Sequence, residues 1–201
     1  MGDSLMAWHG SSGRSISHVM SRALNEPVQN NAVSGARIIY SFPVSGALGL
    51  RISNQLTGDS WDWVVLNGGG NDLWWGCGCG RCERRLNQMI SSDGSDGHIP
   101  DLIADLQRRG ARVVYVGYLR HPGNVSLVSN CKAAGDQLDS RIAKLASIQA
   151  NVYFLSNADR VPYGDRSYHA ADMIHPSLKA SAEIGRDIAR LIAQVEDEEV
   201  D

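Results

Sequence analysis

The sequence has few of the features that mark membrane, fibrous or nucleic-acid-binding proteins. Its apolar runs fall far short of the roughly 20 residues that span a bilayer, and no internal repeat or signal-peptide pattern is visible. The net charge of -3 offers no basic surface for nucleic acid or an anionic membrane. At 201 residues and 43% hydrophobic content, the chain is long enough to bury a substantial core. We therefore expect one domain over residues 1–195 and an acidic tail over 196–201.

Apolar runs alternate with helical patterns along the chain, which is typical of a parallel α/β sheet. The expected strands are 28–33, 63–66, 113–116 and 152–155, and the expected helices are 16–24, 48–56, 102–110, 133–148 and 184–195. The run at 63–66 is apolar throughout, as in a strand that is buried on both faces. This order predicts helices on both sides of the sheet and a ligand site beyond the carboxyl ends of the strands.

Four short motifs stand where strands should end or helices begin. They are Gly2-Asp3-Ser4-Leu5, Ser34-Gly35, Gly69-Gly70-Asn71-Asp72 and Asp172-Met173-Ile174-His175. A serine hydroxyl becomes a good nucleophile when a base takes its proton, and that base is commonly a histidine oriented by a carboxylate. Asp172 and His175, three residues apart before a proline, have the spacing for such a pair. The motifs therefore predict a site in which Ser4 is activated by His175.

Acyl transfer also needs hydrogen-bond donors that face the oxygen of the tetrahedral intermediate. The candidates are the backbone N–H groups of Ser4 and Gly35 and the side-chain amide of Asn71. Glycine at position 35 permits close approach of the backbone, and the Asn71 amide is a donor that does not titrate. Asp3 and Asp72, beside this site, are interpreted as carboxylates that hold turns through hydrogen bonds to the backbone.

These four motifs, in this order and over nearly the whole chain, resemble the four sequence blocks of the SGNH (GDSL) hydrolases. The resemblance implies a three-layer α/β/α, flavodoxin-like fold with a five-stranded parallel sheet. It also implies a serine esterase or lipase without a cofactor or metal. By this resemblance Ser4 is the nucleophile, His175 the base and Asp172 its orienter. Ser4, Gly35 and Asn71 would form the oxyanion hole.

Two assignments near the site have alternatives. His169 also lies three residues from Asp172, but only His175 follows the aspartate as the block requires. The remaining histidines (His9, His18, His98 and His121) have no carboxylate pattern and are interpreted as surface or hydrogen-bonded residues. Trp74 and Trp75 are candidates for lining the substrate pocket, and the alternative is that they cover the core.

The four cysteines point to an oxidising compartment. Cys77, Cys79 and Cys82 lie close together, whereas Cys131 is remote. Disulfides are the favoured interpretation, with three possible connectivities, while a zinc site and reduced thiols are the alternatives. A bridge from the cluster to Cys131 would tie down the irregular segment after Asp72. We therefore expect a periplasmic or secreted protein.

The predicted function is cleavage of carboxylic esters with small to medium acyl chains through an acyl-serine intermediate. The expected partner is a small-molecule ester. Carboxylesterase, carbohydrate deacetylase, thioesterase and lysophospholipase activities all remain open, and the lack of an evident lid helix disfavours long-chain triglycerides. The alternative is a non-catalytic binding or cell-envelope module with the same fold.

The start of the sequence departs from the family pattern. In a flavodoxin-like sheet the first strand lies between two neighbours and ends at the nucleophile turn. Only Met1 precedes Gly2, so the first strand is expected to be missing from the sheet and the turn to be loosely held. The expectation that follows is an upstream segment that carries both this strand and a signal peptide.

Overall fold

The computed structural model describes residues 1–58, 60–123 and 128–200, and within these ranges the protein has a parallel sheet of three strands. The strands are β1 (Trp63–Leu66), β2 (Arg112–Val116) and β3 (Val152–Leu155), in the order β1-β2-β3. Val64 pairs with Val113, and Val114 pairs with Tyr153. The α-helices are α1 (Ser4–Ala7), α2 (Ile16–Leu24), α3 (Pro43–Ser45), α4 (Gly70–Cys77), α5 (Glu83–Met89), α6 (His98–Arg108), α7 (Lys132–Ile148) and α8 (Leu178–Val200).

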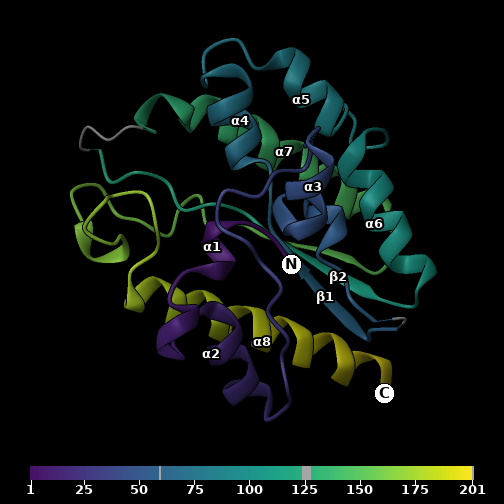
Figure 1. Cartoon of the computed structure of the whole chain (residues 1–201). Helices are drawn as coiled ribbons and strands as arrows, with labels where there is room; N and C mark the ends of the chain where they lie inside the picture. Colours follow the sequence, from purple (N-terminus) through teal and green to yellow (C-terminus); the bar gives the residue numbers. More distant parts are fainter. Residues whose placement is uncertain (59, 124–127, 201) are drawn as a thin grey trace.

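Helices cover both faces of the sheet, so the fold has three layers, as expected (Figure 1). Successive strand residues point to opposite faces. Val113 and Tyr115 of β2 join a core with α4, α5, α6 and α7, whereas Val114 and Val116 join a second core with α1, α2 and α8. This arrangement confirms the α/β prediction and explains why the strands are apolar at consecutive positions.

Most elements lie where the sequence predicts them. Strands β1, β2 and β3 and helices α2 and α7 match their expected ranges to within one residue. Helix α2 begins after Ser15 and ends at Leu24. The next residue, Asn25, caps the helix in a left-handed conformation (φ 55°) before Pro27. Four short turns of 3₁₀-helix, η1 (Gly10–Ser12), η3 (Ile52–Asn54), η4 (Ser129–Cys131) and η5 (Arg166–Tyr168), occur in the connections.

The strand expected at 28–33 does not form. Side-chain amides take the place of a ladder there: Asn30 donates to the carbonyl of Met6 (2.9 Å), and Asn31 donates to the carbonyl of Gln55 (2.9 Å). The Val33 N–H makes one backbone bond, to the carbonyl of Gly2 (3.1 Å). The apolar residues of this segment predicted a strand. Its single backbone bond to Gly2 does not make a β-ladder.

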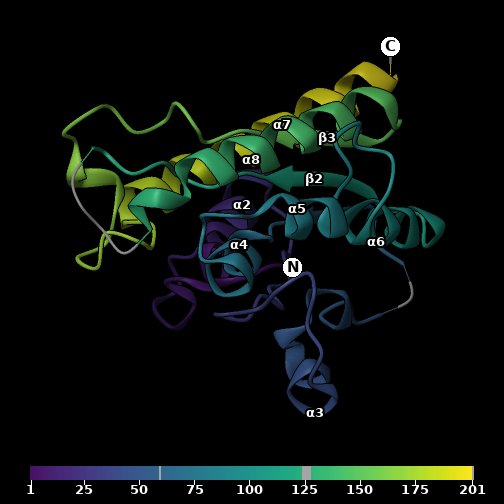
Figure 2. The same ribbon diagram turned by 90° about the horizontal axis from the view of Figure 1, so that it is seen from above.

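The helix expected at 48–56 is also wrong. The chain forms a π-helical turn, η2 (Gly46–Leu50), followed by η3. Gly49 inside η2 has non-helical angles (φ 95°, ψ 0°) and Arg51 is extended, so a continuous helix cannot run through them. In the view from above, α3 and its neighbours project from the layered body (Figure 2). Asp59, expected in the following turn, lies outside the described residues.

The acidic end of the chain is helical through Val200 instead of fraying at residue 196. The Glu196 carboxylate accepts hydrogen bonds from the indole of Trp63 (2.8 Å) and the guanidinium of Arg112 (3.4 Å). These contacts hold the last turns of α8 against the sheet. Asp201 is not among the described residues. No helix in the described ranges is long and apolar enough to cross a membrane.

The turn that carries Ser4 is anchored by hydrogen bonds of Met1 and Gly2. The amino group of Met1 donates to the carbonyl of Val65 (2.8 Å), and the N–H of Asn67 donates to the carbonyl of Met1 (3.3 Å). The buried side chain of Gln55 accepts from the Gly2 N–H (2.6 Å) and donates to the Gly2 carbonyl (2.8 Å). Gly2 has φ 143°, and a Cβ at this position would lie 2.8 Å from the Asn67 carbonyl oxygen. The turn is therefore held by these contacts and is not loose, contrary to the expectation.

Candidate active site

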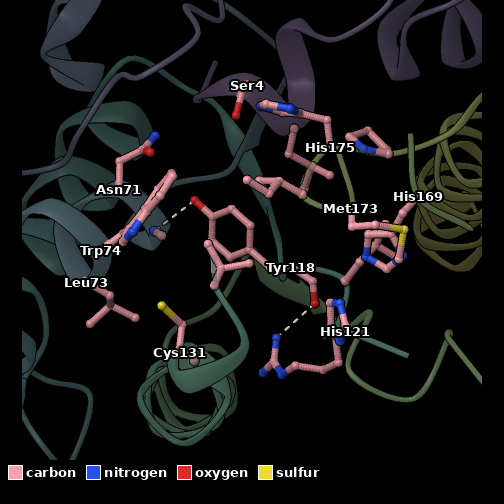
Figure 3. Close-up of a pocket in the computed structure, with 18 of the residues that line it drawn as sticks. Ser4, Asn71, Leu73, Trp74, Tyr118, His121, Cys131, His169, Met173 and His175 are labelled. Carbon is pink, nitrogen blue, oxygen red and sulfur yellow. Dashed lines mark hydrogen bonds between the residues drawn. The ribbon is translucent and has the colours of Figure 1, made fainter. Parts of the chain in front are cut away.

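A cavity of about 160 Å³ opens beyond the carboxyl ends of β1 and β2, where the sequence predicted a ligand site (Figure 3). Its apolar wall includes Leu73, Trp74, Leu119, Val128, Met173 and Ile174. Its polar lining includes Ser4, Asn71, His121, His169 and His175. Segments remote in sequence therefore meet here, and four of the predicted site residues, Ser4, Asn71, Trp74 and His175, share one cavity.

Ser4 is placed by the short helix α1, which it begins. The Asp3 side chain caps this helix by accepting a hydrogen bond from the Leu5 N–H (3.0 Å). The Tyr118 hydroxyl also donates to the Asp3 carboxylate and accepts from the Gly70 N–H (2.9 Å). Burial raises the pKa of Asp3, while the hydrogen bonds from Tyr118 and Leu5 oppose that rise. Tyr118 therefore ties the turn that carries Ser4 to the start of α4.

His175 and Asp172 form the pair that their spacing predicted. The Nδ1 atom of His175 lies 2.6 Å from the Asp172 carboxylate, which also accepts from the backbone N–H groups of Ile174 and His175 (both 3.0 Å). Partial burial acts to raise the pKa of Asp172, but these hydrogen bonds outweigh it and hold the pKa below its ordinary value. An ionised carboxylate therefore fixes the imidazole, whose ring faces the hydroxyl of Ser4 (Figure 3).

Asn71 faces the cavity from α4, but its amide is already engaged. It donates to the carbonyl of Ala36 (3.1 Å) and to the Asp3 carboxylate (3.3 Å). These contacts fix the amide beside Ser4. For Asn71 to bind an oxyanion, one of its N–H groups must be shared with, or released from, a present acceptor.

Gly35 lies in a tight turn in which the Ala36 N–H donates to the carbonyl of Val33 (3.0 Å), and its φ is 81°. Gly35 is not among the cavity-lining residues. The turn is fixed from the other side by Asp72, whose carboxylate accepts from the N–H groups of Ile38 (2.8 Å) and Ile39 (2.9 Å). Burial raises the pKa of Asp72 to about 6. The turn-holding interpretation of Asp3 and Asp72 is therefore confirmed.

The two tryptophans predicted at the pocket differ in position. Trp74 lines the cavity, whereas Trp75 is 66% exposed and is not among the lining residues. Their ring centroids are 4.8 Å apart, so Trp75 packs on the outer side of Trp74. Trp74 alone of this pair is placed to contact a bound molecule in the cavity.

Several residues of the site were not identified from the sequence. Trp8 stacks on the His175 ring, and the His9 ring lies 3.1 Å from the carbonyl oxygen of Pro176. Among the residues that the structure describes, a buried ring nitrogen of His121 and one of His169 have no hydrogen-bond partner. No spacing in the sequence marks Trp8 or His9, because each contacts a segment at the opposite end of the chain. The interpretation of His9 as hydrogen-bonded is confirmed. For His121 the interpretation is wrong, because its Nε2 atom is buried and has no hydrogen-bond partner among the described residues.

The cysteines form two disulfides, Cys77–Cys82 and Cys79–Cys131, and Cys131 also lines the cavity. The second bridge confirms the expected link between the irregular segment and the remote cysteine. In the described part of the chain, no three histidine, cysteine, aspartate or glutamate side chains converge to hold a metal ion.

Comparisons with known proteins identify a family and a shared fold. The model of the GDSL-like Lipase/Acylhydrolase family matches residues 1–182. No match is found among curated proteins. The structure of a G-D-S-L family protein from Desulfitobacterium hafniense DCB-2 superposes with a TM-score of 0.67 at 14% identity, covering 94% of this chain and 95% of the other.

Two esterase structures are similar over nearly their full length. Est24, a carbohydrate acetylesterase from Sinorhizobium meliloti, has a TM-score of 0.62 at 16% identity and 97% coverage of both chains. The inhibitor-bound aryl esterase of M. smegmatis has a TM-score of 0.62 at 14% identity and 96% coverage of both chains. At these identities the likeness shows a shared fold.

Proposed function

Because the chain belongs to the GDSL-like lipase/acylhydrolase family, we propose that it hydrolyses carboxylic esters of small to medium acyl chain through an acyl-Ser4 intermediate. The observation that carries this proposal is that Ser4 and His175 line one cavity with the Ser4 hydroxyl facing the imidazole (Figure 3), while the Asp172 carboxylate lies 2.6 Å from Nδ1 of His175. The Ser4 hydroxyl faces an imidazole whose far nitrogen is held by an ionised carboxylate. That is the arrangement by which a serine is activated.

The proposed reaction has two halves. His175 takes the proton of the Ser4 hydroxyl as Oγ attacks the ester carbonyl carbon, and the protonated ring then gives that proton to the leaving alcohol. A water molecule, deprotonated by His175, attacks the acyl-serine carbonyl, and Ser4 leaves with the returned proton as the acid is released. Asp172 orients the ring and stabilises its charge throughout.

The oxygen that becomes negative in each half needs donors. The proposal assigns these to the backbone N–H groups of Ser4 and Gly35 and to the amide of Asn71. Asn71 is already held beside Ser4 by Ala36 and Asp3. The bond to Ala36 holds the amide in place, and the longer bond to Asp3 (3.3 Å) is the one that would give way to the oxyanion.

Asn71→Ala tests the oxyanion assignment. We expect a loss of roughly a hundredfold in kcat with a smaller change in KM, because the donor acts mainly on the charged intermediate. The loss of the bond to Ala36 should also cost about 1 kcal/mol of stability. Steady-state kinetics and thermal unfolding of the same samples separate the two effects. A rise in KM with unchanged kcat would instead assign Asn71 to ground-state binding.

The substrate range follows from the size of the cavity. Its 160 Å³ is well below the roughly 300–1,000 Å³ of sites for drug-sized ligands. Its wall of Trp74, Leu119 and Met173 suits a short apolar acyl group. The acetylesterase and aryl esterase among the structural neighbours fit this class of substrate.

A series of p-nitrophenyl esters from acetyl to dodecanoyl tests the proposed function. We expect the highest kcat/KM between acetyl and butyryl, because longer chains exceed the cavity, and no turnover above background from the Ser4→Ala control. A steady rise through octanoyl would contradict the proposed chain length. The absence of turnover with every ester would favour the non-catalytic module instead.

We also propose an oxidising location, the periplasm or the outside of the cell. Two disulfides among four cysteines support it, because structural disulfides persist in such compartments and are rare in the cytosol.

A further inference from the structure

The indole of Trp8 lies flat against the imidazole of His175. Their ring centroids are 3.8 Å apart and their planes differ by 6°. Trp8 closes α1, the helix that Ser4 begins, and its N–H donates to the carbonyl of Ser4 (2.9 Å). One turn of helix therefore carries both the hydroxyl that loses a proton and the aromatic face that covers the ring receiving it.

A second contact holds the same two segments together. His9, next to Trp8, has φ 63°, and its Nε2 lies 3.1 Å from the carbonyl oxygen of Pro176, the residue after His175. Asp172 holds Nδ1 of His175 from its own loop. The imidazole is therefore fixed on one face by Trp8 and on one edge by Asp172, while its other edge faces Ser4 (Figure 3).

Several charged or titratable groups surround this ring. Asp172 contacts it directly, and Asp3 interacts with it electrostatically from the nucleophile turn. His9 reaches the backbone beside it, and His169 pairs through the backbone with Pro176. Both carboxylates favour a positive ring, whereas a positive charge on either histidine would oppose it. Trp8 is uncharged, and it always favours the positively charged form of the His175 ring, because the face of an indole attracts a cation.

We propose that Trp8 is a positioning residue for His175, which holds the plane of the imidazole toward Ser4 and stabilises the imidazolium formed when Ser4 loses its proton. This inference rests on the proposed function for its catalytic part. The proton moves from the Ser4 hydroxyl to Nε2 and then to the leaving alcohol, and in the second half from water to Nε2 and then back to Ser4, so the ring is charged only between these pairs of transfers. Stabilisation at that stage lowers the barrier for attack.

Trp8→Leu and Trp8→Phe separate the aromatic face from simple packing. Leucine still covers the ring but has no π face, whereas phenylalanine keeps a smaller one. We expect Trp8→Leu to lower kcat by about 3- to 30-fold with little change in KM, and Trp8→Phe to retain most of the activity. The acidic limb of the kcat/KM profile of Trp8→Leu should move to lower pH, because the imidazolium has lost a stabilising contact.

An NMR titration of the His175 ring gives a readout that does not depend on turnover. The His175 signals are assigned by comparison with His175→Ala, and thermal unfolding confirms that each variant is folded. The midpoint of ring protonation should move to lower pH in Trp8→Leu and remain near its native position in Trp8→Phe. Trp61→Leu is the matched control, since Trp61 donates to Thr57 (3.0 Å) and does not line the cavity. Its midpoint should not move.

The possible failures are distinguishable. A kcat loss in Trp8→Leu with an unmoved NMR midpoint would reduce Trp8 to a packing residue and overturn the proposal. A midpoint that moves to higher pH would also overturn it, since the indole would then disfavour the charged ring. If no ester is hydrolysed but the midpoint moves as expected, the proposed function fails while the contact between Trp8 and the charged ring stands.

Discussion

Ser4→Ala is expected to lower kcat/KM for a p-nitrophenyl ester by about 10³- to 10⁴-fold, because the acyl group then has no oxygen to which it can be transferred. The hydroxyl has no hydrogen-bond partner among the residues that the structure describes, so its removal should change stability by less than about 0.5 kcal/mol. Steady-state kinetics with a thermal unfolding curve of the same sample tests both statements. A variant with a clearly lower midpoint of thermal unfolding than the native protein would show that the loss of activity comes from unfolding.

His175→Ala should be as damaging as Ser4→Ala, since both changes stop the same proton transfer. His169→Ala is the matched control, because His169 also lines the cavity but the Asp172 carboxylate is bonded to His175. Asp172→Asn should be milder than either catalytic change, since the base remains but loses its charged partner. Inactivation by His169→Ala together with activity in His175→Ala would show that the base has been assigned to the wrong histidine.

The sheet could be predicted from the sequence because its strands are short apolar runs, and the central strand β2 is buried on both faces. Val113 and Val114 belong to different cores, so both must be apolar, and the resulting run is visible without a partner strand. The site motifs could be predicted for a related reason. Asp172 and His175 interact within one loop, where three residues of spacing are enough to bring them together.

The errors lie where a contact with a distant segment decides the local structure. The segment 28–33 has strand-like residues, but Asn30 and Asn31 bond to remote carbonyls and only Val33 joins the backbone of Gly2. The stack of Trp8 on His175 joins residues from opposite ends of the chain. No periodicity or spacing in the sequence indicates this stack. The hydrogen bond from Tyr118 to Asp3 is equally invisible in the sequence, because it too joins distant segments.

The cysteine pairing shows the same limit. Sequence allowed three connectivities, and the structure pairs Cys77 with Cys82 and Cys79 with Cys131. Cys79 ends up opposite Cys131 because α4 stops at Gly78 and Cys79 adopts a left-handed conformation (φ 61°).

The two disulfides should contribute unequally to stability. In the chain-entropy model a bridge stabilises by restricting the unfolded chain, and the effect grows with the length of the loop that it closes. Cys79–Cys131 spans a sequence separation of 52, whereas Cys77–Cys82 spans 5. The expected contributions are about 4 kcal/mol for the long loop and about 2 kcal/mol for the short one.

Two paired variants measure this difference. We expect Cys79→Ala/Cys131→Ala to lower the midpoint of thermal unfolding by about 8–16 °C, and Cys77→Ala/Cys82→Ala to lower it by about half as much. The long bridge also fixes Cys131 in the cavity wall at the start of α7, while Ser4 and His175 lie on other segments. Its removal should therefore raise KM more than it lowers kcat. Equal destabilisation by the two variants would show that native-state packing, and not loop closure, sets the contribution of each bridge. Detection of four free thiols in the unreduced folded protein would show that the bridges do not form.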